Sequence, residues 1–284
     1  MMRSKFLSLL IRAPSVCRSM STATKLTTID VNDKTGIATL TLNRSPINAL
    51  NVELLQDLNE SIKEIEDNKS RGLILTSSND KVFSAGLDLN EMYRPDKDRA
   101  RLLWIKLQDV WLALYSCDLP TAAAINGYAP AGGCLLATVC EYRVMLPKCR
   151  IGFNETQLGI VPPIFCMFNF LNVLPRRVAE RSLSQGQMFT TEQALQIGLV
   201  DDVVSSKGEA LDKCTKFIDT FAKVNPLARS LAKQQFRAAD LQRFQTERAK
   251  DLESFLAFIN HPQMQEGLGI YLNSLKKKQQ LNAV

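Results

Sequence analysis

The 284-residue chain contains a single histidine, His261. Ser–His–Asp and Cys–His mechanisms, and the usual metal sites that include histidine, would all have to use this one residue. His261 precedes Pro262 in what we expect to be a turn between two helices, which favours an exposed structural role. Acid–base chemistry in this protein is therefore expected to belong to a carboxylate.

Cysteine is present but is not arranged for disulfides or zinc. The seven cysteines are odd in number, form no C-x-x-C pair, and mostly have apolar neighbours in the sequence. This pattern is typical of small core residues in a reduced compartment, and we expect no metal site. Long apolar runs are also missing, so we expect no membrane insertion.

Acidic residues are absent before Asp30, whereas residues 1–29 contain five basic ones. That segment supplies five of the six excess positive charges, so the rest of the chain is nearly neutral and we expect no nucleic-acid partner. Residues 1–25 are also rich in serine, with Leu, Ile and Phe interspersed, which is typical of a mitochondrial transit peptide. We therefore expect localisation in the mitochondrial matrix; the alternative is a disordered tail without an address.

Strand-like and helix-like segments alternate after residue 25. The predicted strands are residues 26–32, 37–44, 72–78, 121–126 and 142–146, together with residues 82–92, which we expect to be a strand that ends in a small-residue loop. The predicted helices of this part are residues 52–68, 96–116 and the end of 127–140, which begins as a loop. Such alternation predicts an α/β core with a parallel or mixed sheet.

The character of the sequence changes near residue 175, and almost everything that follows has helical spacing. The helix-like segments are residues 175–186, 190–200, 207–224, 226–240, 242–260 and 262–280. We expect three parts in the chain: the transit peptide at 1–25, an α/β core at 26–200, and a helical C-terminal subdomain at 201–284.

Three segments could carry chemistry, and each lies where a strand gives way to a loop or helix. In F-S-A-G-L-D-L, residues 83–89, small residues let a ligand approach backbone N–H groups, although an ordinary glycine turn would look the same. In N-G-Y-A-P-A-G-G-C-L-L, residues 126–136, two glycines open a helix whose free N–H groups suit an oxyanion, although they could simply permit tight packing.

The third segment, I-G-F-N-E-T-Q-L-G-I at residues 151–160, places Glu155 among apolar and uncharged neighbours. A buried carboxylate without a partner is costly, because desolvation disfavours its charged form. Glu155 could alternatively be an acid at a helix N-terminus, where the dipole stabilises it by about 0.3–1 kcal/mol.

Together, in this order and spacing, the three segments resemble the crotonase (enoyl-CoA hydratase/isomerase) superfamily, and look most like its mitochondrial Δ3,Δ2-enoyl-CoA isomerases. The resemblance covers nearly the whole chain after the presequence. It implies an α/β fold, a spiral of β-β-α turns, with a helical C-terminal part used in trimer formation, and an acyl-CoA thioester as substrate.

Residue roles also follow from the resemblance. The oxyanion hole is expected at the backbone N–H groups of Ala85 and Gly132, and Asn154 is expected beside the acyl group. The segment formed by Ala85, Gly86, Leu87, Asp88 and Leu89 is expected to line the path of the CoA pantetheine.

The choice of reaction depends on counting carboxylates. Hydratases of the superfamily use two glutamates, one of them in a G-G-C-E motif, but this chain has Leu135 at that position and keeps only Glu155. One carboxylate is sufficient to move a proton from C2 to C4. We therefore predict an isomerase that converts 3-enoyl-CoA, cis or trans, to trans-2-enoyl-CoA in β-oxidation of unsaturated fatty acids.

We expect the reaction to need no cofactor, since CoA arrives with the substrate. Two alternatives remain open. One is another reaction on the same fold, such as hydration, dienoyl-CoA isomerisation or thioester hydrolysis, and the other is a non-catalytic role in binding acyl-CoA or RNA. We expect the depth of the acyl pocket to depend on how Trp104, Trp111, Phe165 and the helical C-terminal part pack.

Overall fold

The computed structural model describes residues 25–281, so the predicted transit peptide lies almost entirely outside the described residues. The strands are β1 (Thr27–Val31), β2 (Ile37–Leu42), β3 (Gly72–Ser77), β4 (Thr121–Ile125), β5 (Ala129–Pro130), β6 (Tyr142–Met145), β7 (Arg150–Gly152), β8 (Phe189–Thr190) and β9 (Asp202–Val203). The α-helices are α1 (Val52–Asp67), α2 (Leu89–Met92), α3 (Lys97–Ser116), α4 (Gly132–Val139), α5 (Ile164–Val173), α6 (Arg176–Gln185), α7 (Thr191–Gln196), α8 (Lys207–Asp219), α9 (Pro226–Ile259) and α10 (Pro262–Leu281). One 3₁₀ helix, η1, spans Glu155–Leu158.

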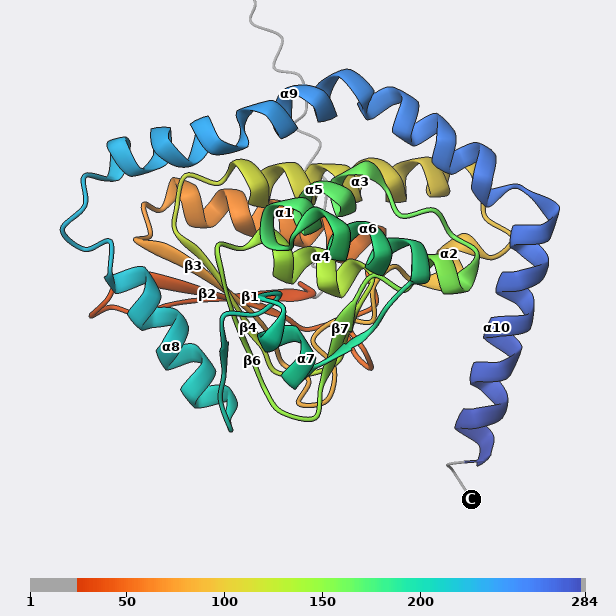
Figure 1. The fold of residues 1–284 in the computed structure, drawn as a ribbon, viewed down its shortest axis with the longest axis horizontal. Helices are drawn as coiled ribbons and strands as arrows, with labels where there is room; N and C mark the ends of the chain where they lie inside the picture. The colour runs from red at the N-terminus through yellow and green to blue at the C-terminus, as the bar shows by residue number, and fades with distance from the viewer. Residues whose placement is uncertain (1–24, 282–284) are drawn as a thin grey trace, which may run out of the picture.

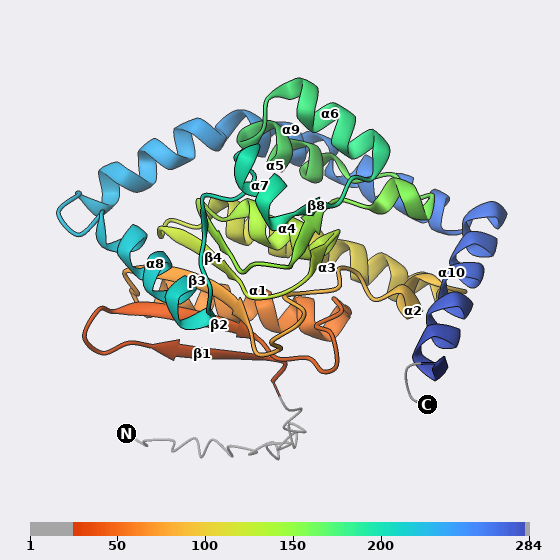
Figure 2. The ribbon, with the colours of Figure 1, turned by 60° about the horizontal axis from the view of Figure 1, so that its bottom comes forward.

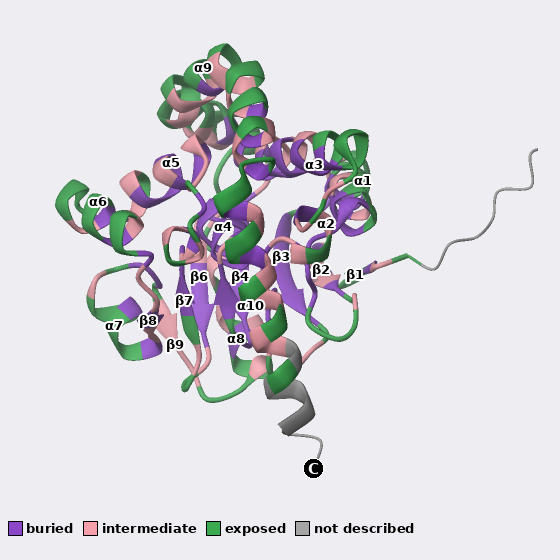
Figure 3. Ribbon diagram, turned by 90° about the vertical axis from the view of Figure 1, so that its right-hand side faces the viewer, coloured by how far each residue is buried: buried purple, intermediate pink, exposed green. Residues whose placement is uncertain are grey.

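A six-stranded sheet in the order β1-β2-β3-β4-β6-β9 forms the centre of the molecule. Its strands are parallel except for β1 and β2, which form an antiparallel hairpin. Helices cover both faces, as expected for a mainly parallel sheet, and the buried residues gather along β3, β4, β6 and α4 (Figure 3). The predicted α/β class with a helical C-terminal part is confirmed.

The two faces of the sheet can be read from alternate residues of β3. Leu73 and Leu75 belong to the larger core cluster, which includes residues of α1, α3 and α4. Ile74 points to the opposite face and packs with Ile218 of α8 in a smaller cluster. Residues 73–75 are therefore all apolar, because side chains on successive residues enter two different cores.

A second, three-stranded sheet in the order β5-β7-β8 positions the functional loops. β5 and β7 are parallel, with Pro130 paired to Gly152. β5 leads directly into α4, and β7 leads directly into η1. Because the carboxyl ends of parallel strands meet at one edge of a sheet, the start of α4 and the start of η1 are brought together.

Two long helices close the chain. α9 crosses the molecule above α3 and α5, and α10 turns away from it and descends along one side (Figures 1 and 2). Buried ion pairs fix α9 to the core: Glu141, just before β6, binds both Arg229 and Lys233. The path of α9 determines where α10 lies.

Several sequence predictions need correction. Residues 82–92 contain no strand: Val82 makes only an isolated bridge to Tyr128, and residues 89–92 form α2. The segments 226–240 and 242–260 form one helix, since no proline or glycine interrupts them. The division at residue 200 stays a prediction; beyond it, β9 still pairs with β6 in the main sheet.

Candidate active site

A cavity of about 430 Å³ lies between the loop before α2, the start of α4, η1 and α10. It is lined by all the predicted site residues except Gly86, namely Ala85, Leu87, Asp88, Leu89, Gly132, Asn154 and Glu155. The structure thus brings together the three segments that the sequence singled out. Tyr271, Leu272 and Leu275 of α10 also line the cavity, although no local sequence pattern indicates that this helix lies here.

The loop of residues 84–87 packs directly against the start of α4, and glycine permits this contact. A Cβ atom on Gly133 would lie 2.4 Å from the carbonyl oxygen of Ser84, and one on Gly132 would lie 3.2 Å from the Cα of Gly86. Gly86 itself has φ +80°, a conformation that favours glycine, and a Cβ there would lie 3.0 Å from the nitrogen of Gly132. Gly86 therefore supports the site from behind and does not line it.

The predicted oxyanion donor at Ala85 is wrong. The N–H of Ala85 donates to the carbonyl oxygen of Ile47 at 3.0 Å, so it is not available to a ligand. Gly86 O accepts from Leu50 N at 2.8 Å, and Asp88 N donates to Leu50 O at 3.0 Å. In extended backbone, groups on alternate residues point to opposite sides, so the N–H of Leu87 points away from Leu50.

Leu87 and Gly132 therefore offer the two free donors. Within the described chain, neither N–H has a hydrogen-bond partner, and that of Gly132 is one of the unpaired groups at the start of α4. The two groups are neighbours, because a Cβ on Gly132 would lie 3.5 Å from the carbonyl carbon of Gly86, the atom bonded to the nitrogen of Leu87. A thioester oxygen between them would receive two hydrogen bonds.

Asp88 has a structural part in holding this loop. Its carboxylate accepts from Arg44 Nη2 at 2.9 Å and caps α2 through the N–H of Asn90 at 3.1 Å. Arg44 also donates to the carbonyl oxygen of Ala49 at 2.7 Å. These bonds tie residues 44–49 to the start of α2 and so fix the backbone that carries the Leu87 N–H.

Glu155 begins η1 and is 8 % exposed. Its Oε2 is buried and has no hydrogen-bond partner in the described part of the chain. Burial raises the pKa of this carboxyl group from its ordinary value of 4.5 to about 7, because desolvation disfavours the anion. A carboxyl group with such a pKa can both accept and give up a proton near neutral pH, which suits a general base.

The neighbours of Glu155 in the cavity are mostly apolar. Leu135 of α4, which stands where the predicted G-G-C-E motif of hydratases would have glutamate, is 2 % exposed and lines the cavity. Asn154 provides the other unpaired polar atom, its buried Oδ1. Around Glu155 the cavity thus combines the unpaired carboxylate oxygen, two N–H donors and the amide of Asn154 with mostly apolar side chains.

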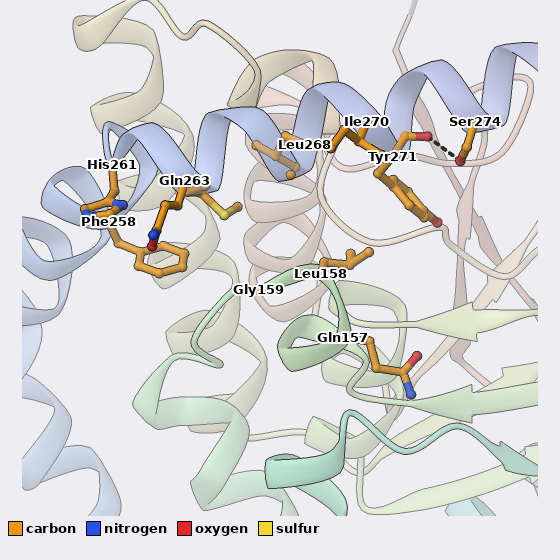
Figure 4. Close-up of a pocket in the computed structure, with 12 residues that line it drawn as sticks. Gln157, Leu158, Gly159, Phe258, His261, Gln263, Leu268, Ile270, Tyr271 and Ser274 are labelled. Carbon is orange, nitrogen blue, oxygen red and sulfur yellow. Dashed lines mark hydrogen bonds between the residues drawn. The ribbon is translucent and has the colours of Figure 1, made fainter.

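His261 lies outside this cavity, in the turn between α9 and α10, and lines a neighbouring hollow of about 520 Å³. Figure 4 shows that hollow between η1 and α10, with Leu158 and Tyr271 approaching each other from the two helices; both residues also line the cavity that contains Glu155. His261 is exposed, in agreement with the structural role expected from the sequence.

Residues 25–281 contain no group of three His, Cys, Asp or Glu side chains arranged to hold a metal ion. Over the same residues, no helix has both the length and the apolar character needed to cross a bilayer.

Comparison with known proteins identifies the family of this chain. The sequence model of the enoyl-CoA hydratase/isomerase family matches residues 32–280. The mouse protein named enoyl-CoA delta isomerase 1, mitochondrial, is 38 % identical over 259 residues, which cover 90 % of this chain and 89 % of the relative. The human protein of the same name is 39 % identical over 246 residues, covering 86 % of this chain and 81 % of the relative.

Among solved structures, the crystal structure of human mitochondrial delta3-delta2-enoyl-CoA isomerase superposes with a TM-score of 0.86 at 38 % identity. The match covers 89 % of this chain and 99 % of the human chain. By sequence, fold and site, the chain belongs to the enoyl-CoA hydratase/isomerase family.

Proposed function

We propose that this enzyme is a Δ3,Δ2-enoyl-CoA isomerase, which converts 3-enoyl-CoA to trans-2-enoyl-CoA. The observation that carries the proposal is the lone buried carboxylate: Glu155 has an unpaired oxygen in the cavity, and Leu135 occupies the place of a second acid. The curated mouse and human relatives and the superposed human structure, all named as isomerases, support the same reaction.

The first step is removal of a proton from C2 of the substrate. The thioester oxygen accepts hydrogen bonds from the N–H groups of Leu87 and Gly132, which stabilise the negative charge that develops on it. One such donor typically lowers a barrier by about 2.7–4 kcal/mol. Glu155 takes the proton, and the electron pair is delocalised over the dienolate.

The second step returns the proton to C4. Protonated Glu155 gives its proton to the far end of the dienolate, the double bond moves to C2–C3, and the carboxylate is restored. Atoms and electrons balance without a second acid, so we propose that the reaction requires no cofactor. The apolar side chain of Leu135 excludes the water that hydration would require.

The proposal extends to the location of the enzyme in the cell and to its oligomeric state. The basic, acid-free segment 1–25 and the mitochondrial relatives support a role in the mitochondrial matrix, in β-oxidation of unsaturated fatty acids. We also propose a homotrimer, which is supported by large apolar side chains exposed on α9: Leu227 is 68 % exposed, Leu231 54 % and Phe236 92 %. Sedimentation equilibrium of the protein lacking residues 1–22 tests the trimer.

A substrate panel tests the reaction. The protein lacking residues 1–22 should isomerise 3-hexenoyl-CoA faster than it hydrates crotonyl-CoA, and the opposite order would refute the assignment. Glu155→Gln should lower isomerase kcat by about 10²–10⁴-fold, the usual contribution of a positioned acid–base group. Glu266→Gln, on the exposed surface of α10, is the matched control and should leave kcat unchanged.

A further inference from the structure

We propose that Trp104 is a specificity-determining residue that ends the acyl-binding part of the cavity and so limits the length of the acyl chain. The inference rests on the proposed function, because it assigns the inner end of the same cavity to the acyl tail. It concerns which acyl-CoA thioesters bind, a property that neither Glu155 nor the two N–H donors determine.

The cavity has an outer and an inner end that differ in exposure. Ile47 and Tyr128, which line it near the surface, are 42 % and 38 % exposed. The inner end is lined by Trp104, Leu107 and Phe165, each of which is 3 % exposed or less. Since the inner walls are apolar, the inner end suits a hydrocarbon tail and the outer end suits the polar CoA.

Trp104 is held rigidly at that inner end. Its ring stacks on Phe255 of α9, with centroids 3.9 Å apart and planes 8° from parallel. Its Nε1 donates to Asp251 Oδ2 at 2.7 Å, and the same oxygen accepts from Gln108 Nε2 at 2.8 Å. Turning the indole out of the way of a longer acyl chain would break a hydrogen bond to a carboxylate and unstack an aromatic pair. The wall is therefore fixed.

The chain supplies a matched control in Trp111, two turns further along α3. Trp111 is 1 % exposed, and its Nε1 donates to Asn169 Oδ1 at 3.0 Å. Its ring stacks on Phe165 with centroids 5.7 Å apart, but Trp111 does not line the cavity. Replacing either tryptophan removes a buried ring and an indole hydrogen bond, yet only replacement of Trp104 enlarges the cavity directly.

The test measures binding of saturated acyl-CoAs of increasing length by calorimetry, together with kcat/KM for the matching 3-enoyl-CoAs. For the unaltered protein, affinity should rise about fourfold for each methylene that enters the cavity and then stop rising. In Trp104→Leu the rise should continue for at least one further methylene, whereas Trp111→Leu should keep the original limit. If Trp104→Leu does not fold, the same measurement is made on Trp104→Phe, a smaller change for which the same direction of shift is expected.

Affinity that rises without a limit in the unaltered protein would overturn the inference, as would the same limit in the folded Trp104 variant. A shift of equal size in the Trp111 variant would also overturn it. Because saturated acyl-CoAs carry no double bond, their binding reports the cavity length even if the isomerase assignment fails. Failure of the assignment would instead appear as absent turnover of 3-hexenoyl-CoA by a protein that binds hexanoyl-CoA.

Discussion

Replacing Glu155 by glutamine should make the protein more stable at alkaline pH while removing its activity. The raised pKa of Glu155, about 7 against an ordinary 4.5, means that the folded state binds this proton more tightly than the unfolded state does. Its protonation therefore favours folding below about pH 4.5, and this advantage is lost as the pH rises through 7. Glutamine is neutral at every pH, so its burial costs no additional folding free energy as the pH rises.

The magnitude follows from the two pKa values. Ionising the buried carboxyl costs roughly 1 kcal/mol of folding free energy at pH 5 and roughly 3 kcal/mol at pH 8. The stability of Glu155→Gln relative to the unaltered protein should therefore increase by about 2–3 kcal/mol between these pH values. For a chain of this size that corresponds to a change of about 5 °C in the difference between the two Tm values.

Thermal unfolding followed by circular dichroism at pH 5 and pH 8 measures this effect. Glu266→Gln, at an exposed position, is the control and should show no such pH dependence. If the Tm difference between Glu155→Gln and the unaltered protein is the same at both pH values, the carboxylate is not desolvated and the argument for its raised pKa is refuted.

Further predictions concern pH, packing and positioning. The kcat/KM of the unaltered protein should rise about tenfold per pH unit below the pKa of Glu155, about 7, and level off above it; a flat profile from pH 5 to 9 would contradict the assigned base. Gly133→Ala should cost about 1–3 kcal/mol by overpacking, seen as a lower Tm and kcat, whereas Gly267→Ala, with open space around it, should lower neither. Arg44→Met should remove the charged hydrogen bond to Asp88, and so lower the free energy of unfolding in urea by about 1.5–3 kcal/mol and also lower kcat/KM. An unchanged free energy of unfolding would show that this pair does not hold the loop of residues 84–87.

The sequence was sufficient to predict Glu155 as the base, but only one of the two N–H groups proposed to bind the thioester oxygen. Glu155 could be predicted because a single acid in an apolar stretch, in a chain with one histidine, has few other uses. Gly132 could be predicted because paired glycines at a helix start leave free N–H groups. Leu87 could not, since the direction of its N–H depends on how residues 86 and 88 pair with Leu50.

Long-range contacts account for the other differences. The strands β5 and β7 are too short to give a periodic signal, yet their pairing brings α4 and η1 together. Trp104 and Asp251 are 147 residues apart, and no local pattern indicates that they meet. Tyr271 reaches the cavity only because α9 continues unbroken to residue 259 and sets the path of α10.

The central claim is that one carboxylate both removes and returns the proton, and isotope transfer tests it most directly. We would convert 3-hexenoyl-CoA deuterated at C2 in ordinary water and measure deuterium at C4 of the product by mass spectrometry after a single turnover. Transfer through Glu155 alone predicts that part of the label reaches C4, because a buried carboxyl group exchanges slowly with solvent. Complete loss of the label to water, together with retained turnover in Glu155→Gln, would contradict the account.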